Sequence, residues 1–189
     1  FALLVYVSCW IKRHEPAAFL AALLNSQPMG FYAPAQLVRD AREHGIEVRP
    51  VDVLLSGAQA TLEEPPGQPP PEPGAEHDFR AQPAVRLGLN QVRGLSDEGI
   101  ERLVRARQER LGQRGPEAFA FDSVEDLARA AALERRDLQA LAQGGALVPL
   151  AGHRAAAHWE VAAVHVLPAL LADTRFDEAP AVLPEPDEA

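Results

Sequence analysis

Residues 92–96 have the sequence Val-Arg-Gly-Leu-Ser and stand directly before a helical pattern that begins at residue 97. A tight glycine turn followed by a helix N-terminus points several backbone N–H groups in one direction, and the helix dipole adds partial positive charge there. The arginine of this turn adds a full positive charge. The residues alone leave open a second interpretation, in which the glycine only caps a helix. The predicted anion-binding residues are Arg93, Gly94, Leu95 and Ser96.

A weaker copy of this arrangement occurs at residues 144–147, Gly-Gly-Ala-Leu, between a helical pattern at 135–142 and a final helical segment. Two helix pairs, each joined by a hydrophobic-glycine-hydrophobic turn, are typical of a tandem helix-hairpin-helix, which holds the phosphodiester backbone of DNA without reading bases. Taken alone, the second turn is more typical of plain glycine C-caps. The candidate DNA-binding residues beyond the first turn are Arg102, Gly144, Gly145 and Arg154.

The remaining reactive side chains form no recognisable catalytic or metal-binding pattern. The six histidines are scattered, and His153 and His158 are five residues apart, which does not place them on one helix face. The single Cys9 excludes a disulfide framework and a cysteine-based zinc site, and its apolar surroundings predict a buried side chain. There is neither a Walker-type phosphate loop nor a pair of acids in an apolar strand that could hold two metal ions. No catalytic or metal-binding residue is therefore predicted.

The elements that precede the first turn are predicted to be mostly helical. Residues 2–26 form two helices in this prediction, the first an apolar core helix and the second beginning at Pro16. A third helix starts near Pro34 and ends at Gly45, a residue typical of a left-handed cap. The alternating and β-branched residues 46–53 predict a short strand.

The middle of the chain is rich in proline, which predicts a break between two folded parts. Seven of the 17 prolines lie between Pro65 and Pro83, together with Gly and Glu, so residues 56–83 are predicted to be a disordered linker or insertion. A short strand follows in the prediction, and helices fill most of residues 97–171. The acidic residues 172–189 are predicted to be a disordered tail. The predicted fold is mainly α, with short strands.

The net charge of −9 does not exclude a nucleic-acid partner, because the acids are concentrated outside the predicted helices. Residues 63–78 carry five acids and no Lys or Arg, and residues 173–189 carry six acids and one arginine. Residues 85–115 instead hold seven arginines against four acids. The segment that contains the first turn is therefore locally basic.

Three long stretches of the sequence closely resemble the bacterial C-family DNA polymerases, and more narrowly the error-prone homologues of the DNA polymerase III alpha subunit. The stretches are residues 1–53, "AVRLGLNQVRGLS" at 84–96 and "VEDLARAAALERRDLQALAQGGAL" at 124–147. The resemblance covers nearly all of residues 1–171 apart from the proline-rich insertion. Because the sequence begins at Phe1 inside an apolar run, we expect it to be part of a longer chain.

The resemblance implies a division of the chain and a set of partners. Residues 1–55 would be the later part of the fingers domain, and residues 84–171 the tandem helix-hairpin-helix that binds primer–template duplex. The palm domain, with its aspartates and Mg²⁺, would lie in a preceding part of the polymerase, so no cofactor is expected in this segment. Other replication or repair proteins would be partners, in the cytoplasm and without a membrane, since the apolar run at residues 1–11 is too short to span a bilayer.

The same resemblance assigns individual positions. Residues 92–96 match the first hairpin of the family, with Ser96 where replicative relatives usually have a second glycine, and a serine there can cap the following helix. The stretch "NSQPMGFY" at 25–32 matches a linker between fingers helices, with Phe31 and Tyr32 packing it down; direct nucleotide contact is the alternative. The alternative for the whole chain is a helical protein-interaction module of a repair complex, with no contact to DNA.

Overall fold

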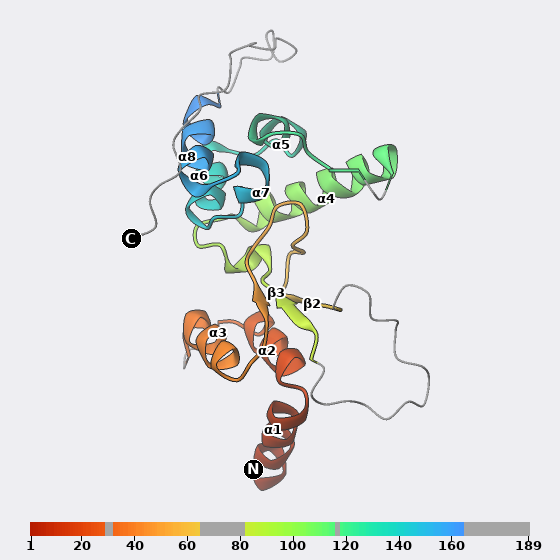
Figure 1. Cartoon of the computed structure of the whole chain (residues 1–189), viewed down its shortest axis with the longest axis vertical. Helices are drawn as coiled ribbons and strands as arrows, with labels where there is room; N and C mark the ends of the chain where they lie inside the picture. Colours follow the sequence, from red (N-terminus) through yellow and green to blue (C-terminus); the bar gives the residue numbers. More distant parts are fainter. Residues whose placement is uncertain (29–31, 65–81, 116–117, 165–189) are drawn as a thin grey trace. The chain divides into compact units, whose positions relative to one another are not determined.

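A computed structural model describes residues 1–28, 32–64, 82–115 and 118–164 of the chain (Figure 1). The predicted mainly helical fold with short strands is confirmed. The chain forms two compact units, and we describe each one by itself. Unit 1 consists of Phe1–Val51 and Leu55–Gln91, and unit 2 consists of Asp52–Leu54 together with the chain from Val92 onward.

Unit 1 combines three helices with a small mixed sheet. The sheet has the order β1-β3-β2, in which β1 and β3 run parallel and β2 and β3 run antiparallel. A short 3-10 helix, η1, at Leu89–Gln91 ends the unit. The longer elements are α1 (Ala2–His14), α2 (Pro16–Asn25), α3 (Pro34–Glu43), β1 (Val48–Arg49), β2 (Thr61–Glu63) and β3 (Ala84–Arg86).

The core of unit 1 lies between α2, α3 and the sheet. Leu20 and Leu24 recur at helical spacing and are buried, and they pack with Ile46 and with Val85 of β3. The starts and ends of these helices confirm the sequence prediction. Proline occupies the first turn of α2 and of α3, and Gly45 follows α3 with a φ of +83°.

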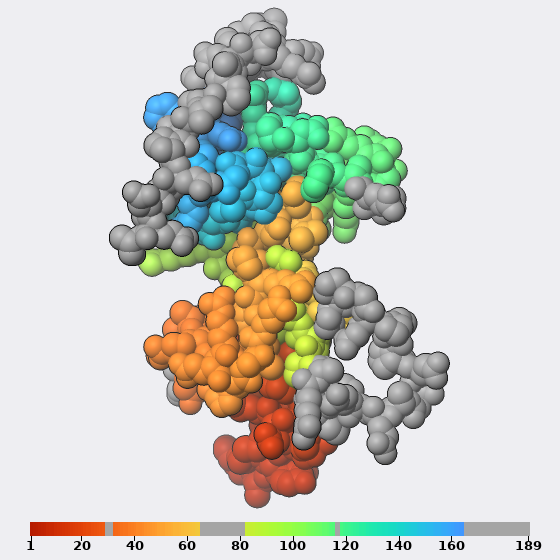
Figure 2. Space-filling view, in the orientation of Figure 1, coloured from red at the N-terminus to blue at the C-terminus, as the bar shows by residue number. Residues whose placement is uncertain are grey.

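Helix α1 corrects the prediction of a core helix. None of its residues is buried, Cys9 is exposed rather than buried, and Leu3, Leu4 and Tyr6 are exposed to 73%, 70% and 67%. Figure 2 shows α1 in dark red, projecting from the rest of unit 1. Apolar composition predicts that a helix will be buried, but it does not identify the surface against which the helix packs. The part of the chain that the structure describes does not cover this face.

The predicted linker over residues 56–83 begins too early. Residues 61–63 form β2, which pairs with β3, and Ala60 is 5% exposed. Composition failed here because contacts with residues distant in sequence hold the end of this segment: strand pairing, the ion pairs of Glu63 and the packing of Ala60 in the core. Residues 65–81, most of the predicted linker, lie outside the described residues, as does the predicted tail at 172–189.

A cluster of charged side chains joins the three strands of unit 1. Glu63 accepts hydrogen bonds from Arg86 Nε at 2.7 Å and Nη2 at 3.0 Å, and from Arg49 Nη1 at 2.6 Å. Arg86 is 7% exposed, and its Nη1 also donates to the carbonyl of Pro50 at 3.2 Å. The hydrogen bonds from Arg86, and then those from Arg49, lower the pKa of Glu63 below its ordinary value of 4.5.

Glu63→Gln is expected to lower the free energy of unfolding of unit 1 by about 1–3 kcal/mol, because it leaves a buried guanidinium without its anion. A carboxylate with a lowered folded pKa contributes fully above its unfolded pKa, and this contribution is lost as the pH falls through the folded value. The difference in free energy of unfolding between wild type and the variant should therefore disappear as the pH falls below about 4.5. Urea unfolding at several pH values measures both effects. Glu47→Gln is the control, since Glu47 is 63% exposed and, within the described residues, forms an ion pair only with Arg49. An equal loss in the two variants would contradict the prediction.

Unit 2 is a bundle of short helices around a leucine-rich core. Leu103, Leu127, Leu138 and Leu141 are each at most 2% exposed. Short α7 was not predicted, because four residues are too few to show a helical period. The helices are α4 (Asp97–Arg114), α5 (Val124–Ala130), α6 (Arg135–Gln143), α7 (Val148–Ala151) and α8 (Arg154–Ala163).

Residues Asp52–Leu54 belong to unit 2, although the sequence predicts a boundary after residue 55. Val53 is fully buried; its N–H donates to the carbonyl of Ala146 and its own carbonyl accepts from Arg107 Nη1, both at 3.1 Å. Strand β3, which the prediction grouped with the second domain, instead pairs in the sheet of unit 1. Both differences arise from contacts between residues distant in sequence.

Candidate functional site

The first predicted turn has the geometry that its sequence requires. Gly94 has a φ of +88°, a left-handed conformation that favours glycine, and the N–H of Leu95 donates to the carbonyl of Val92 at 3.2 Å. Ser96 is the N-cap of α4, and its Oγ accepts from the N–H of Gly99 at 3.0 Å. The prediction that a serine here caps the helix is therefore confirmed.

The N-terminus of α4 already holds an anion, and that anion belongs to the protein. The carboxylate of Asp137, in the first turn of α6, accepts from the N–H of Ser96 at 3.0 Å and from its Oγ at 3.1 Å. Arg102 Nη2 lies 3.5 Å from the same carboxylate. Asp137 is 2% exposed, and a Cβ on Gly99 would come within 2.7 Å of its Oδ2. The N-terminus of α4 thus binds the Asp137 carboxylate through hydrogen bonds and a close fit beside Gly99.

Asp137 changes what the first turn can offer to an external anion. The N–H of Ser96 is occupied, and Arg102, a predicted DNA-binding residue, faces an internal partner. The N–H groups of Arg93 and Gly94 make no hydrogen bond within the described residues, and the Arg93 side chain is exposed and unpaired there. Arg93 and Gly94 are therefore the members of this turn that remain open to a ligand.

The locally basic segment at residues 85–115 is largely neutralised by the fold. Of its seven arginines, five have an acceptor, and all five of these acceptors come from outside the segment. Arg93 and Arg105 have none within the part of the chain that the structure describes. The five pairs are Arg86–Glu63, Arg102–Asp137, Arg107 with the carbonyl of Val53, Arg110–Asp126 and Arg114–Asp122. Sequence charge alone therefore overstates the free positive charge of this segment.

Two unpaired arginines that the sequence analysis did not select stand at the start of α6. Arg135 and Arg136 are exposed, and neither has an ion pair or side-chain hydrogen bond within the described residues. They directly precede Asp137, whose carboxylate contacts Ser96 of the first turn. The adjacent arginines of "ERRD" were visible in the sequence, but their place beside the first turn depends on a contact across 41 residues.

The second predicted turn uses its backbone to cap α6. The N–H of Gly144 donates to the carbonyl of Ala140 at 2.9 Å, and the N–H of Gly145 donates to that of Ala142 at 3.0 Å. Arg154 Nη2 donates to the carbonyl of Gln143 at 2.5 Å. This geometry fits the capping interpretation. A Cβ on Gly144 would lie 3.2 Å from Val92 Cγ1, so the two turns pack against each other.

The described polar side chains of the stretch at residues 25–32 bond to the backbone of unit 1. Asn25 pairs with the backbone of Ala60, donating at 2.9 Å and accepting at 2.8 Å. Ser26 and Gln27 bond to carbonyls of the preceding turn of α2. These contacts favour the architectural interpretation of the stretch. Tyr32 does not pack down as predicted, since it is 62% exposed, and Phe31 lies outside the described residues.

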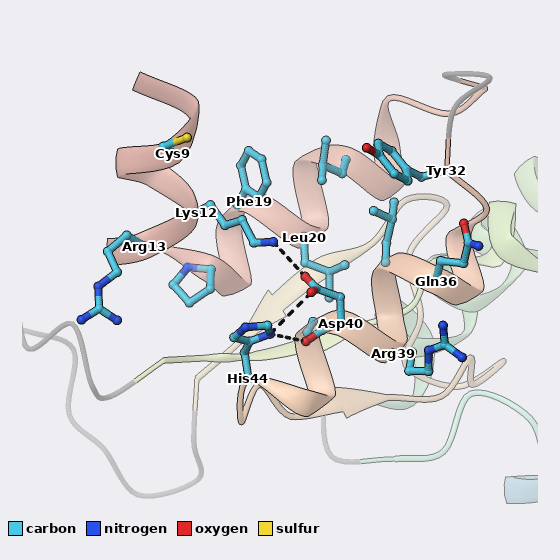
Figure 3. Close-up of a pocket in the computed structure, with 14 residues that line it drawn as sticks. Cys9, Lys12, Arg13, Phe19, Leu20, Tyr32, Gln36, Arg39, Asp40 and His44 are labelled. Carbon is cyan, nitrogen blue, oxygen red and sulfur yellow. Dashed lines mark hydrogen bonds and ion pairs between the residues drawn. The ribbon is translucent and has the colours of Figure 1, made fainter. Parts of the chain in front are cut away.

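An open groove of about 910 Å³ runs between α1, α2 and α3 in unit 1 (Figure 3). Its polar side contains Asp40, which pairs with Lys12 at 3.1 Å and accepts at its backbone carbonyl from His44 at 2.6 Å. Tyr32 and Phe19 line the opposite, apolar side in Figure 3. Within the described ranges, no three His, Cys, Asp or Glu side chains gather as a metal site, and no helix is long and apolar enough to cross a membrane.

Comparison with known proteins agrees with the geometry of unit 2. The helix-hairpin-helix motif family matches residues 45–157. An error-prone DNA polymerase of Burkholderia pseudomallei (strain K96243) is 52% identical over 95% of this chain and 15% of its own length. Enzymes of the same name from Azoarcus sp. (strain BH72) and Methylococcus capsulatus (strain Bath) are 50% and 48% identical over all of this chain, and over 16% and 18% of their own lengths. The chain thus spans less than a fifth of the length of these relatives. It belongs to the helix-hairpin-helix family and is homologous to a segment of the error-prone DNA polymerases of the bacterial C family.

Proposed function

We propose that this chain is a DNA-backbone-binding part of an error-prone DNA polymerase. One observation supports the proposal most strongly: in the part of the chain that the structure describes, Arg93 stays exposed and unpaired beside the left-handed Gly94 turn, while most neighbouring arginines have internal partners. A free guanidinium beside two unoccupied backbone N–H groups suits a phosphate oxygen, which accepts hydrogen bonds and carries charge.

In this proposal the first turn contacts the duplex and the second turn is mainly structural. Gly144, Gly145 and Arg154 hold the end of α6, and through it the position of Asp137 and of the first turn. Arg102 acts through the same contact between Asp137 and Ser96, because it shares the carboxylate of Asp137 with Ser96. Contacts of this kind would be independent of DNA sequence and strongly dependent on salt.

The whole polymerase would carry out DNA-directed DNA synthesis in the cytoplasm, in replication and in damage-induced translesion repair synthesis. The nucleotidyl transfer would use Mg²⁺ held by aspartates in a palm domain outside this segment, where the metal stabilises the attacking and leaving oxygens. This chain would hold the duplex product, and unit 1 would help to orient the fingers. Other replication or repair proteins would be its partners.

One observation favours a second candidate, a protein-interaction module without DNA contact. The apolar side chains of α1, among them Leu3, Leu4 and Trp10, are exposed and offer apolar surface that a partner protein could cover. Under this alternative both glycine turns are helix caps, and the charge of Arg93 does not matter to binding.

Arg93→Glu separates the two candidates. The expected result is a loss of at least about eightfold in affinity for a fluorescent duplex at 0.1 M salt, which is the effect of one lost phosphate contact. Fluorescence anisotropy measures it, and circular dichroism checks helix content. Arg39→Glu is the matched control, because it makes the same charge change at a side chain that is 74% exposed in unit 1. Equal affinities for the two variants would favour the protein-interaction module.

A further inference from the structure

We propose that Arg135 and Arg136 form, together with Arg93, one phosphate-binding surface on unit 2, and that the buried carboxylate of Asp137 holds its two halves together. The inference rests on the proposed function and deepens it, because it names the residues that extend the DNA contact beyond the first turn. The ligand is the phosphodiester backbone of a duplex.

The geometry brings the three arginines into one neighbourhood. Asp137 accepts from Ser96, three residues after Arg93, at 3.0 Å and 3.1 Å. Consecutive Cα atoms are about 3.8 Å apart, so Arg136 and Arg135 begin one and two such steps from Asp137. A Cβ on Gly94 would lie 3.9 Å from the Cβ of Ala140, so α6 also packs along the turn itself.

Most of the described arginines elsewhere in unit 2 have an internal partner, and exposed Arg105 is the exception. Arg110, Arg114 and Arg129 each pair with a carboxylate at 2.6–2.9 Å. The three proposed residues are exposed, and within the described part of the chain no acid lies within ion-pair distance of them. Asp137, which is adjacent to Arg136, pairs with Ser96 and Arg102 instead, and the other nearby acids, Asp97, Glu98 and Glu134, pair with none of the three within the described residues.

Arg135 and Arg136 also occupy positions that do not serve the stability of α6. A cation in the first turn of a helix opposes the helix dipole, and its unfavourable effect is about 0.3–1 kcal/mol. Neither side chain gains a partner among the described residues in return. A phosphate would supply the missing anion, and the planar guanidinium matches its oxygens in a two-hydrogen-bond geometry. The surface therefore suits a row of phosphates better than it suits the protein alone.

The test uses the 189-residue chain and a fluorescein-labelled 20-base-pair duplex, titrated by anisotropy at several salt concentrations. The double variant Arg135→Gln, Arg136→Gln should bind about 60-fold more weakly than wild type at 0.1 M salt, and the slope of log affinity against log salt should fall in magnitude by about 1.8. Arg13→Gln with Arg39→Gln is the control, because it removes the same charge from exposed residues of unit 1. The control should bind with the slope of wild type.

The outcomes distinguish this inference from the proposed function. If wild type binds with a salt-dependent affinity and the double variant matches the control, the inference is wrong and the proposed function stands. If wild type shows no salt-dependent binding, the proposed function is wrong and the inference falls with it. Removing first-turn cations should not destabilise α6. Should the double variant lose helix content, the two single variants decide, each with an expected fall of about 0.9 in slope.

Discussion

Asp137→Ala is expected to lower the free energy of unfolding of unit 2 by about 3–5 kcal/mol, the cost of breaking a buried, hydrogen-bonded charge pair. The variant leaves the N–H and Oγ of Ser96 without their acceptor and removes the anion that faces Arg102. It also opens space beside Gly99, where the carboxylate fits closely. Urea unfolding followed by circular dichroism measures the loss.

The matched control for this variant is Asp122→Ala. Asp122 pairs with Arg114 at 2.8 Å, but its side chain is 65% exposed, so its removal should lower the free energy of unfolding much less than the removal of Asp137 does. The loss of free energy of unfolding for Asp137→Asn, which keeps one acceptor oxygen, should lie between the losses for Asp137→Ala and Asp122→Ala. Losses of similar size for Asp137→Ala and Asp122→Ala would mean that Asp137 does not occupy the N-terminus of α4 as described.

Gly88→Ala is expected to destabilise unit 1 by about 3 kcal/mol, the upper part of the usual range for overpacking. A Cβ at this position would lie 2.3 Å from the carbonyl carbon of Gln59 and 2.6 Å from the backbone nitrogen of Ala60. These are backbone atoms, so a side-chain rotation cannot relieve the clash. The movement would also break the pairing of Asn25 with Ala60, which holds the end of α2.

Gly112→Ala is a control of opposite sign. Gly112 lies within α4, and a Cβ there has no heavy atom within 4 Å. The added methyl group should therefore stabilise the helix by about 0.5–1 kcal/mol. Thermal unfolding of both variants by circular dichroism gives the two signs in one experiment. An unchanged melting temperature for Gly88→Ala would contradict the close approach of residues 59 and 60 to β3 and η1.

Local sequence signals predicted the helices well because helix ends depend on near neighbours. Proline at the starts of α2 and α3, serine before α4 and α5, and glycine after α3 and α6 each act within a few residues. Such signals are read directly from the chain. The tandem-turn arrangement of unit 2 followed from them, and the resemblance to polymerases agreed with it.

Most of the features that the sequence did not predict depend on contacts between residues distant in sequence. The partner of Ser96 lies 41 residues away, and the carboxylate that neutralises Arg86 lies 23 residues away in a segment rich in proline and glutamate. Neither periodicity nor local charge can show such pairs. For the same reason the seven arginines of residues 85–115 suggested more free charge than the fold leaves. The prediction that α1 is a buried core helix is wrong, because its apolar side chains are exposed.

The salt dependence of wild-type binding shows whether this chain holds the backbone of duplex DNA. Anisotropy titrations of two duplexes with unrelated sequences, each at four salt concentrations, should give equal affinities. The slope of log affinity against log salt should be roughly −2.7 if Arg93, Arg135 and Arg136 each contact one phosphate. A folded chain that does not bind either duplex at low salt, or that binds with no dependence on salt, would contradict the account.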